Sequence, residues 1–438
     1  MQTNFLPHLL ADPDTALAEK ILRKCVHCGF CTATCPTFLE LGDELDSPRG
    51  RIYLIKEMLE TGRPADDETV KHLDRCLSCL SCMTTCPSGV DYMHLVDHAR
   101  THVEKTYRRP LVDRVIRRSL SIVLTRPTLF RLALIGAAIV RPLARFLPKR
   151  LAAPFLLMPK RPPSPSPVDT PQVVAATAPR RMRVALLNGC AQPVLDPAIN
   201  EATVRLLTRL GCEVVVAKGA GCCGALDHHM GATDRSHAHA AANIEAWSAE
   251  IEAGGLDRIV INTSGCGTTV KDYGHMFRND PHLAAKAAKV ASIARDVSEV
   301  LAELDLAGAV KADRRPKIAY HSACSMQHGQ KITTLPMELL GRAGFEVTPI
   351  PESHVCCGSA GTYNILQADL ASRLRDRKVA NIATTGADVI AAGNIGCIMQ
   401  IASGTSTPIL HTVELLDWAT GGPVPEKLAG LVAAKAFG

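Results

Sequence analysis

Cysteines at fixed spacing dominate the chemistry that this 438-residue sequence could perform. The stretch CVHCGFCTATCP, Cys25 to Pro36, fits C-x2-C-x2-C-x3-C-P, and CLSCLSCMTTCP repeats that spacing from Cys76 to Pro87. Such spacing is typical of [4Fe–4S] ligation, in which the fourth cysteine of a run ligates the other cluster in two-cluster proteins. We therefore assign two [4Fe–4S] clusters, the first held by Cys25, Cys28, Cys31 and Cys86 and the second by Cys76, Cys79, Cys82 and Cys35.

Structural zinc on two all-cysteine sites is the alternative. Zinc sites usually space their cysteine pairs farther apart and need no third cysteine separated from the second by only two residues. A proline after each run fixes the turn and removes an N–H group, and two such runs favour clusters. Clusters that share crossed ligands must lie near each other, so we expect single electrons to pass between them.

Eight further cysteines form two sets that reveal an internal duplication. Corresponding cysteines of the two sets lie 134, 134, 134 and 131 residues apart. They occur in the paired stretches RVALLNGC and KIAYHSAC, GCCG and VCCG, and INTSGC and AAGNIGC. We expect one iron–sulfur or redox site in each repeat, from Cys190, Cys222, Cys223 and Cys266, and from Cys324, Cys356, Cys357 and Cys397. The alternative is that these are buried small hydrophobic residues, as free cysteines often are. Cys212 has no counterpart, and we expect it in the core.

Four histidines lie near the repeat cysteines in sequence. His321 and His354 could tune the second site, although we expect their hydrogen bonds to be satisfied, and His228 and His229 fit either role. The stretch KGAGCCG mimics a dinucleotide-binding fingerprint. Its counterpart ESHVCCG lacks two of the three glycines but keeps both cysteines, so we expect no nucleotide site.

The elements that position these cysteines can be read from the apolar pattern. RIYLIKEMLETG, from Arg51, predicts a helix that ends on Gly62, between the two N-terminal runs. RVALL, CEVVVA and RIVINT are short strands separated by helical stretches, which indicates α/β repeats with mainly parallel sheets. The cysteines follow strands, at the edge where ligands bind in open α/β sheets. Helix N-termini at that edge favour anionic thiolates.

We expect a multidomain α+β and α/β protein in which a helical two-cluster domain precedes two α/β repeats. A basic stretch separates them, with thirteen Lys and Arg against the single acid Asp113 between Arg108 and Arg161. Its apolar and polar pairs in LVDRVIRRSL predict an amphipathic helix. The expected boundaries are a two-cluster domain 1–107, a basic helical segment 108–158, a proline-rich linker 159–181, a first repeat 182–310 and a second repeat 311–438.

The basic segment has two open interpretations. It lies on the anionic inner face of a membrane, where each Lys or Arg contributes about 1 kcal/mol, or it covers a partner subunit. No DNA-reading motif accompanies it, so we expect no nucleic-acid partner. The N-terminus lacks an export signal, and the longest relevant apolar run, Leu132 to Val140, is short of the roughly 20 residues that span a membrane. Clustered thiols then indicate a reducing cytoplasm.

The stretch ILRKCVHCGFCTATCPTFLELGDELDSPRGRIYLIKEMLE resembles the iron–sulfur subunits of bacterial glycolate oxidases. A two-cluster ferredoxin-type domain followed by two CCG (cysteine-rich) repeats is similar to their whole architecture, except over residues 108–181. The resemblance implies that FAD-bearing flavoprotein partners oxidise glycolate to glyoxylate. This chain, not catalytic alone, would then pass electrons singly towards the quinone pool, at the inner face of the cytoplasmic membrane.

Related complexes share this layout. Subunits of anaerobic glycerol-3-phosphate dehydrogenase and of lactate-utilisation complexes resemble the chain as well, and the DELDSPRGR run favours glycolate. The CCG repeats are also similar to those of heterodisulfide reductase, an enzyme of thiol–disulfide chemistry. In that family the pattern ends in C-x-x-C, whereas here Thr263 and Asn394 replace the first cysteine. Each repeat thus lacks a fifth thiol ligand, which argues against disulfide reduction.

Overall fold

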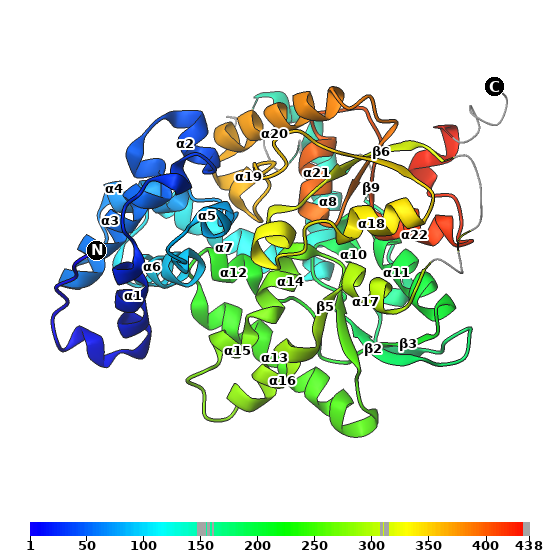
Figure 1. Ribbon diagram of the computed structural model, residues 1–438, viewed down its shortest axis with the longest axis horizontal. Helices are drawn as coiled ribbons and strands as arrows, with labels where there is room; N and C mark the ends of the chain where they lie inside the picture. The colour runs from blue at the N-terminus through cyan, green and yellow to red at the C-terminus, as the bar shows by residue number, and fades with distance from the viewer. Residues whose placement is uncertain (147–154, 156–157, 160–161, 307–309, 311–314, 432–438) are drawn as a thin grey trace.

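The computed structural model describes the chain except for residues 147–154, 156–157, 160–161, 307–309, 311–314 and 432–438. Most of the predicted basic segment after residue 146, and the predicted start of the second repeat at 311, lie outside the described residues. The described part comprises a helical N-terminal module, drawn in blue in Figure 1, and two α/β repeats beside it. This arrangement confirms the expected fold class.

The N-terminal module is helical, with no strand among its described residues. The predicted helix from Arg51 is confirmed as part of α3, which begins after the N-cap Ser47 and ends at Gly62, whose φ is +63°. Helices α1, α3, α4 and α6 pack around one apolar core. The helices are α1 (Pro13–Lys24), α2 (Pro36–Leu41), α3 (Pro48–Thr61), α4 (Asp67–Asp74), α5 (Ser81–Thr85) and α6 (Tyr92–Thr106), with short 3-10 turns η1 (Leu9–Ala11), η2 (Phe30–Thr32) and η3 (Glu44–Asp46).

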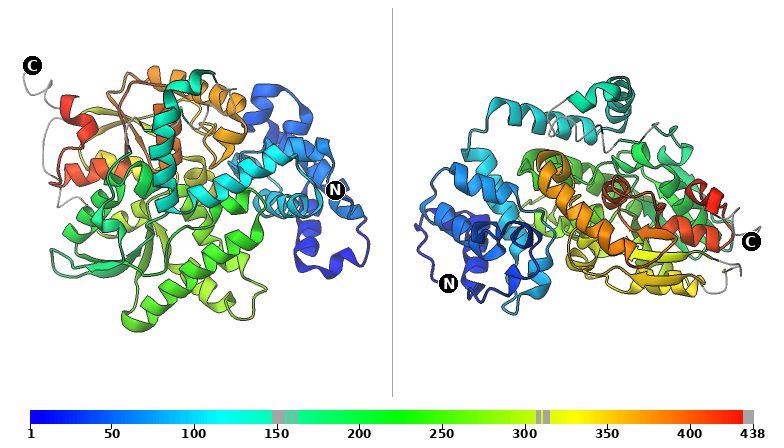
Figure 2. Two further views of the ribbon diagram at one scale, coloured as in Figure 1. Left: turned by 180° about the vertical axis from the view of Figure 1, so that it is seen from behind. Right: turned by 90° about the horizontal axis from the view of Figure 1, so that it is seen from above.

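Two helices, α7 (Leu111–Leu124) and α8 (Pro127–Val140), leave the module and run over the repeats, followed by η4 (Arg141–Phe146) (Figure 2). Helix α7 confirms the helix predicted from LVDRVIRRSL. Phe130 and Leu134 on α8 pack against Val194 of the first repeat. No single helix in the described part of the chain is long and apolar enough to cross a membrane. The pair α7 and α8 meets that length and composition only when taken together, and it bends by 116°.

The first repeat is built on a five-stranded sheet in the order β1-β3-β2-β4-β5. Its strands are β1 (Gln172–Val174), β2 (Met182–Leu186), β3 (Cys212–Val216), β4 (Arg258–Ile261) and β5 (Ala294–Asp296). All neighbours pair in parallel except β1, which lies antiparallel to β3 at the edge. Strand β1 falls within the stretch predicted to be a linker, and the sequence analysis missed it. The helices are α10 (Gln192–Leu195), α11 (Ala198–Arg209), α12 (Ala225–His229), α13 (Thr233–Gly254), α14 (Ser264–Lys271), α15 (Tyr273–Met276), α16 (Ala284–Ile293) and α17 (Val297–Glu303).

The second repeat has a four-stranded parallel sheet in the order β7-β6-β8-β9, which matches β3-β2-β4-β5 of the first. Its strands are β6 (Lys317–His321), β7 (Glu346–Pro349), β8 (Val389–Ala392) and β9 (Ile409–His411). The shared strand order and the matching register of one central strand pair confirm the duplication, because Val184 pairs with Arg258 and Ile318 pairs with Val389. Its helices are α18 (Leu335–Arg342), α19 (Tyr363–Leu366), α20 (Ala368–Ala383), α21 (Ile395–Ala402) and α22 (Thr412–Ala419), with a π-helical turn η7 (Ser325–Gly329) and a 3-10 turn η8 (Glu426–Leu428).

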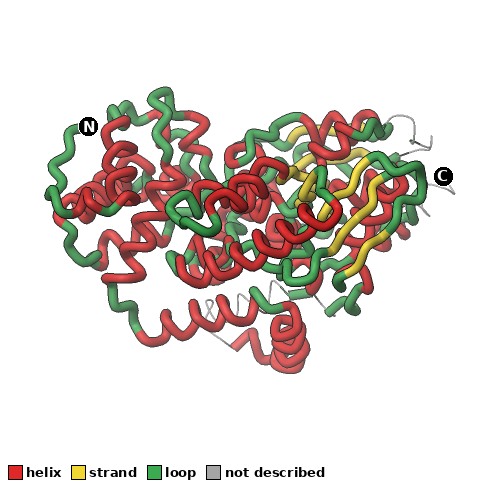
Figure 3. The backbone as a smooth tube through the Cα atoms, turned by 90° about the horizontal axis from the view of Figure 1, so that it is seen from below, coloured by secondary structure: helices red, strands yellow, loops and turns green. Residues whose placement is uncertain are grey.

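One hydrophobic cluster spans both repeats, and a second lies within the first repeat. Buried side chains from β2, β3, α11 and α17 of the first repeat join those of β6, α18 and α22 of the second in one cluster. The yellow strands in Figure 3 lie together at one end of the molecule, away from the helical module. The repeats are therefore not independent, and we expect a substitution in the shared cluster of one repeat to change the stability of the other as well.

Candidate metal centres

The cysteines of the N-terminal module line two adjacent cavities. One cavity is lined by Cys25, Cys28, Cys31, Cys82 and Cys86. The other is lined by Cys35, Cys76, Cys79 and Cys82. Each cavity is thus lined by three thiols of one cysteine run and by one or two of the other, which suits a cube that needs four thiolates. The structure brings all eight predicted N-terminal residues to these cavities, while the ligation itself stays a prediction.

The two cysteine loops share an unusual backbone. His27 and Gly29 have φ of +54° and +85°, and the corresponding positions of the second run, Ser78 and Leu80, have +47° and +63°. A left-handed conformation costs a residue other than glycine about 1–2 kcal/mol. Alternating right- and left-handed residues turn successive N–H groups to one side and form a concavity for a negatively charged group. Both loops therefore hold a shape that suits an anionic cluster.

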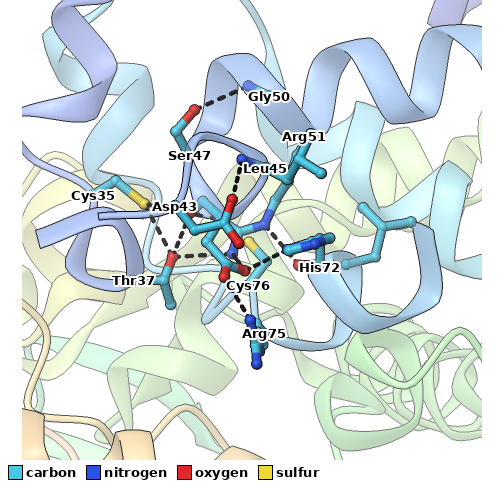
Figure 4. A network of polar contacts seen from close by, with 12 residues as sticks. Cys35, Thr37, Asp43, Leu45, Ser47, Gly50, Arg51, His72, Arg75 and Cys76 are labelled. Atoms are coloured by element: carbon cyan, nitrogen blue, oxygen red, sulfur yellow. Dashed lines mark hydrogen bonds and ion pairs between the residues drawn. The ribbon is translucent and has the colours of Figure 1, made fainter. Parts of the chain in front are cut away.

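A buried arginine lies against the second set of thiols (Figure 4). Arg51 is only 1% exposed, and its Nη1 lies 3.8 Å from Sγ of Cys35. Burial opposes its charge, but Cys76, Tyr92 and Cys35 raise the pKa of the Arg51 guanidinium above its ordinary value. The side chain thus supplies a fixed positive charge where thiolates would gather.

The carboxylate of Asp46 anchors that arginine. Its oxygens lie 3.3 Å from Nη2 of Arg51, 2.9 Å from Nδ1 of His72 and 2.7 Å from Nη1 of Arg75. Asp46 also lies within metal-binding distance of Asp43 and His72, but the two guanidinium groups already occupy its oxygens. The sequence analysis missed this network, although the DELDSPRGR run that it quoted contains both Asp46 and Arg51. Residues Asp46 and Arg51 of that run hold the cysteine loops in position through buried ion pairs and hydrogen bonds.

A second buried arginine supports the loop after Cys76. Nη2 of Arg100 donates to the carbonyl of Cys76 at 2.6 Å, and Nη1 contacts the Ser78 hydroxyl at 2.5 Å. Burial favours the neutral thiol, yet Arg51 and Arg100 lower the pKa of Cys76 below its ordinary value. The thiolate form, which binds metal, is therefore favoured at this position.

Each repeat brings its four predicted cysteines together. In the first repeat, the Cys190 thiol lies beside that of Cys222, and the Cys223 thiol lies beside that of Cys266. In the second, Sγ of Cys324 lies 3.8 Å from Sγ of Cys356, and Cys357 contacts Cys397. The structure therefore places all eight residues as expected, while metal binding by them stays a prediction.

The glycine of each CCG motif is required by the backbone. Gly224 and Gly358 both have φ of +86°, which favours glycine. A Cβ atom at Gly224 would lie 2.7 Å from the carbonyl oxygen of Ser236, and one at Gly358 would lie 2.5 Å from that of Ala371. The loop with its two cysteines is thereby pressed against α13 or α20, which fixes the position of the thiols.

The N-terminal module contacts the second repeat through a cysteine. Cys79 shares a buried cluster with Cys356 and Tyr363, with Cys324 at its border. Burial raises the pKa of the Cys79 thiol, and Cys324 is the neighbouring thiol that raises it most. Beside this contact, the hydroxyl of Thr84 lies 2.8 Å from Nδ1 of His328. The module cavity lined by Cys79 therefore lies next to the thiols of Cys324 and Cys356 in the second repeat.

The remaining predicted residues differ in how they are partnered. Nε2 of His228 lies 3.0 Å from Asp97 of the module, and His229 lies close to the same carboxylate. Cys212 is fully buried in β3, which confirms the expected core position. His321, expected to be satisfied, has no hydrogen-bond partner among the described residues, and that expectation was wrong.

Thr263 and Asn394, which stand where a fifth thiol would be, have other roles. The Thr263 hydroxyl donates to Oε1 of Gln192 at 2.6 Å. Oδ1 of Asn394 accepts from the N–H of Gly396 at 3.0 Å and caps α21, the helix that carries Cys397. Both residues thus begin a helix that presents a cysteine.

Comparisons with known proteins agree with this arrangement. Residues 21–90 match the model of a 4Fe-4S dicluster domain, and residues 184–271 and 318–402 match that of a cysteine-rich domain. Over its length the chain is 44% identical to the glycolate oxidase iron-sulfur subunit of Escherichia coli K12, covering 96% of this chain and 99% of that protein. It is 31% identical to a probable glycolate oxidase iron-sulfur subunit of Bacillus subtilis 168, covering 92% and 95%. Lactate utilization protein A of Bacillus licheniformis is 30% identical over 54% of this chain and 99% of its own length.

Proposed function

The chain belongs to the family of glycolate oxidase iron-sulfur subunits, and we propose that it carries electrons from glycolate, oxidised on a flavoprotein partner, towards quinone. It is an iron–sulfur electron-transfer subunit of an oxidoreductase complex, is not catalytic alone, and has two [4Fe–4S] clusters in its N-terminal module. Glycolate loses two electrons and two protons when it becomes glyoxylate. A flavin that accepts the pair and releases the electrons singly lies, in this proposal, on the partner.

The proposal assigns the clusters to the residues that line the two cavities. Three thiols of each run hold one cluster, and the last cysteine of the other run completes it. The lining of the cavities supports this crossed assignment. The proposed ligands are Cys25, Cys28, Cys31 and Cys86 for the first cluster and Cys76, Cys79, Cys82 and Cys35 for the second.

The surface around the first cavity is the proposed docking site of the flavoprotein. Val26 and Phe30, which flank Cys28, are 66% and 61% exposed, and Cys28 itself is exposed. Tyr53 is also exposed and stacks on His27 with ring centroids 4.4 Å apart. Exposed aromatic and apolar side chains beside a redox centre suit a partner that must bring its flavin close.

Electrons leave the module, in this proposal, through the second cluster site. Cys79 is buried against Cys356 of the second repeat, whereas no cysteine of the first repeat shares a buried cluster with a module cysteine among the described residues. The order of transfer is therefore partner flavin, first cluster, second cluster and then the thiols of the second repeat, where these hold a further iron–sulfur group.

The helices α7 and α8 are the proposed membrane-binding surface, which places the protein peripherally on the inner face of the cytoplasmic membrane. Helix α8 exposes Leu132 at 64% and Ile139 at 77%, and Arg114 and Arg118 of α7 and Arg126 between the two helices are exposed as well. An apolar surface bordered by arginines matches anionic lipid. Not all of the basic charge is free for this role, because Asp74 pairs with two of its arginines, Arg109 and Arg117.

The proposed function is tested by adding substrate to the chain with and without its flavoprotein partner. Glycolate should reduce the clusters, seen by their electron paramagnetic resonance (EPR) signals, only when the partner is present. Lactate and glycerol 3-phosphate serve as alternative substrates in parallel samples. Reduction by lactate but not by glycolate would overturn the substrate assignment, and reduction of the isolated chain by glycolate would overturn the role as an electron-transfer subunit.

A further inference from the structure

His321 is buried beside two thiols of the second repeat without a hydrogen-bond partner. It ends strand β6 and is 2% exposed, and neither ring nitrogen has a partner among the described residues. A ring nitrogen of His321 and the Sγ atoms of Cys357 and Cys397 all lie within 4.8 Å of one another. A buried polar group that lacks a partner costs free energy, so its persistence next to two thiols points to a missing ligand.

The first repeat provides an internal comparison. The stretches RVALLNGC and KIAYHSAC align Leu187 with His321, each three residues before the first cysteine of its set. Leu187 is buried in the core of the first repeat together with Cys223. The same position of the same fold is thus filled equally well by an apolar side chain. Packing alone does not require an imidazole at residue 321.

We propose that His321 binds, through one ring nitrogen, an iron of an iron–sulfur group in the second repeat, together with the thiolates of Cys324, Cys356, Cys357 and Cys397. The inference rests on the proposed function only in that the second repeat carries such a group. Imidazole and thiolate both bind iron and zinc. Five donors exceed the four that a structural zinc ion takes, which favours a group with more than one iron.

An imidazole ligand would give the second repeat a different net charge and reduction potential from those of an all-thiolate site. A neutral imidazole brings one negative charge fewer than a thiolate, and histidine ligation raises the reduction potential of iron–sulfur groups. The second repeat, the one in contact with Cys79, would then accept an electron more readily than an all-thiolate site. His321 would make the step from the module into the second repeat favourable.

The test uses the full-length chain, purified without oxygen, reduced with dithionite and labelled with 15N-histidine. Pulsed EPR should detect a nitrogen coupling that changes with the label. The coupling should vanish in His321→Leu, which copies the first repeat, and in His321→Cys, where the group should be retained at a lower reduction potential. The matched control is His354→Gln, two residues before Cys356, and it should keep the coupling.

Three results would overturn the inference. They are the absence of a histidine coupling in the unsubstituted chain, a coupling unchanged in His321→Leu, and zinc in place of iron in the second repeat. If His321→Leu fails to fold, His321→Cys decides alone, because a coupling that persists there cannot arise from residue 321. Dithionite replaces substrate throughout, so failure of this inference is separate from failure of the glycolate assignment.

Discussion

Cys79 of the N-terminal module and Cys356 of the second repeat are buried in one hydrophobic cluster. The contact joins the cavity proposed for the second cluster to the thiols of the second repeat. The first repeat meets the module through polar pairs instead, among them His94 with Asp272. The duplicated repeats are thus equivalent in fold but not in their place along an electron route.

This asymmetry predicts different effects of two matched substitutions. Cys356→Ser and Cys222→Ser each remove the first thiol of a CCG pair. In the assembled complex, Cys356→Ser should slow the reoxidation of the module clusters by quinone, because it alters the step after Cys79, while Cys222→Ser should change it far less. Stopped-flow reoxidation after a glycolate pulse measures both. Equal slowing by the two variants would contradict a route through the second repeat.

Substitution of Arg51 should destabilise the module and release iron. Arg51→Gln leaves Asp46 with fewer buried cations, and breaking a buried ion pair costs about 3–5 kcal/mol. The control is Arg49→Gln, whose partly exposed pair with Glu44 is worth about 0–1 kcal/mol. Urea unfolding and iron per chain give the two readouts. The account is wrong on this point if both variants retain iron and stability equally.

The charge of His94, which contacts Asp272 of the first repeat, should make the stability of the protein depend on pH. Nδ1 and Nε2 of His94 lie 2.6 Å from Asp91 and 3.0 Å from Asp272. Burial opposes the charge, but these carboxylates raise the pKa of His94 to about 10. The ring stacks on His275, whose pKa burial and His94 lower to about 4.

The sign follows from comparison with an unfolded histidine, whose pKa is about 6.5. Because the folded pKa of His94 is higher, its stabilisation is complete below about pH 6.5 and is lost as the pH rises towards 10. His94→Gln should therefore lower the urea midpoint most near pH 6 and least near pH 10. The exposed His282 provides the control His282→Gln. A loss that is independent of pH would show that the charge of His94 plays no part.

Charged substitutions on α8 should weaken membrane binding. Ile135→Asp combined with Ile139→Asp places two negative charges on the exposed apolar side of the helix, where anionic lipid repels them. Flotation with phosphatidylglycerol vesicles at low and high salt measures binding, and Val173→Asp on the exposed edge strand is the control. Unchanged flotation, accompanied by weaker binding of the flavoprotein, would assign this surface to the partner.

The sequence alone predicted much of this architecture, because cysteine spacing and strand patterns are local signals. The duplication could be read from cysteine separations, and it reappears as the same order of four strands, with β2–β4 and β6–β8 in the same register. The strand Gln172–Val174 was missed because its neighbouring prolines suggested a linker, and its pairing with β3 is a tertiary contact.

The supporting charges could not be predicted in the same way. Asp46 and Arg51 look like surface residues in the sequence, and their meeting with His72 depends on how α3 and α4 pack. Whether His321 finds a hydrogen-bond partner depends on the residues that surround the end of β6. Spacing therefore indicates which thiols gather, whereas the groups that tune them emerge only from the packed structure.

The central claim, that this chain carries electrons on two [4Fe–4S] clusters, is tested most directly by its iron and acid-labile sulfide content after purification without oxygen. The account predicts at least about eight irons and eight sulfides per chain, four of each for a cluster, and more if the repeats hold further groups. Near-zero iron with bound zinc would contradict it.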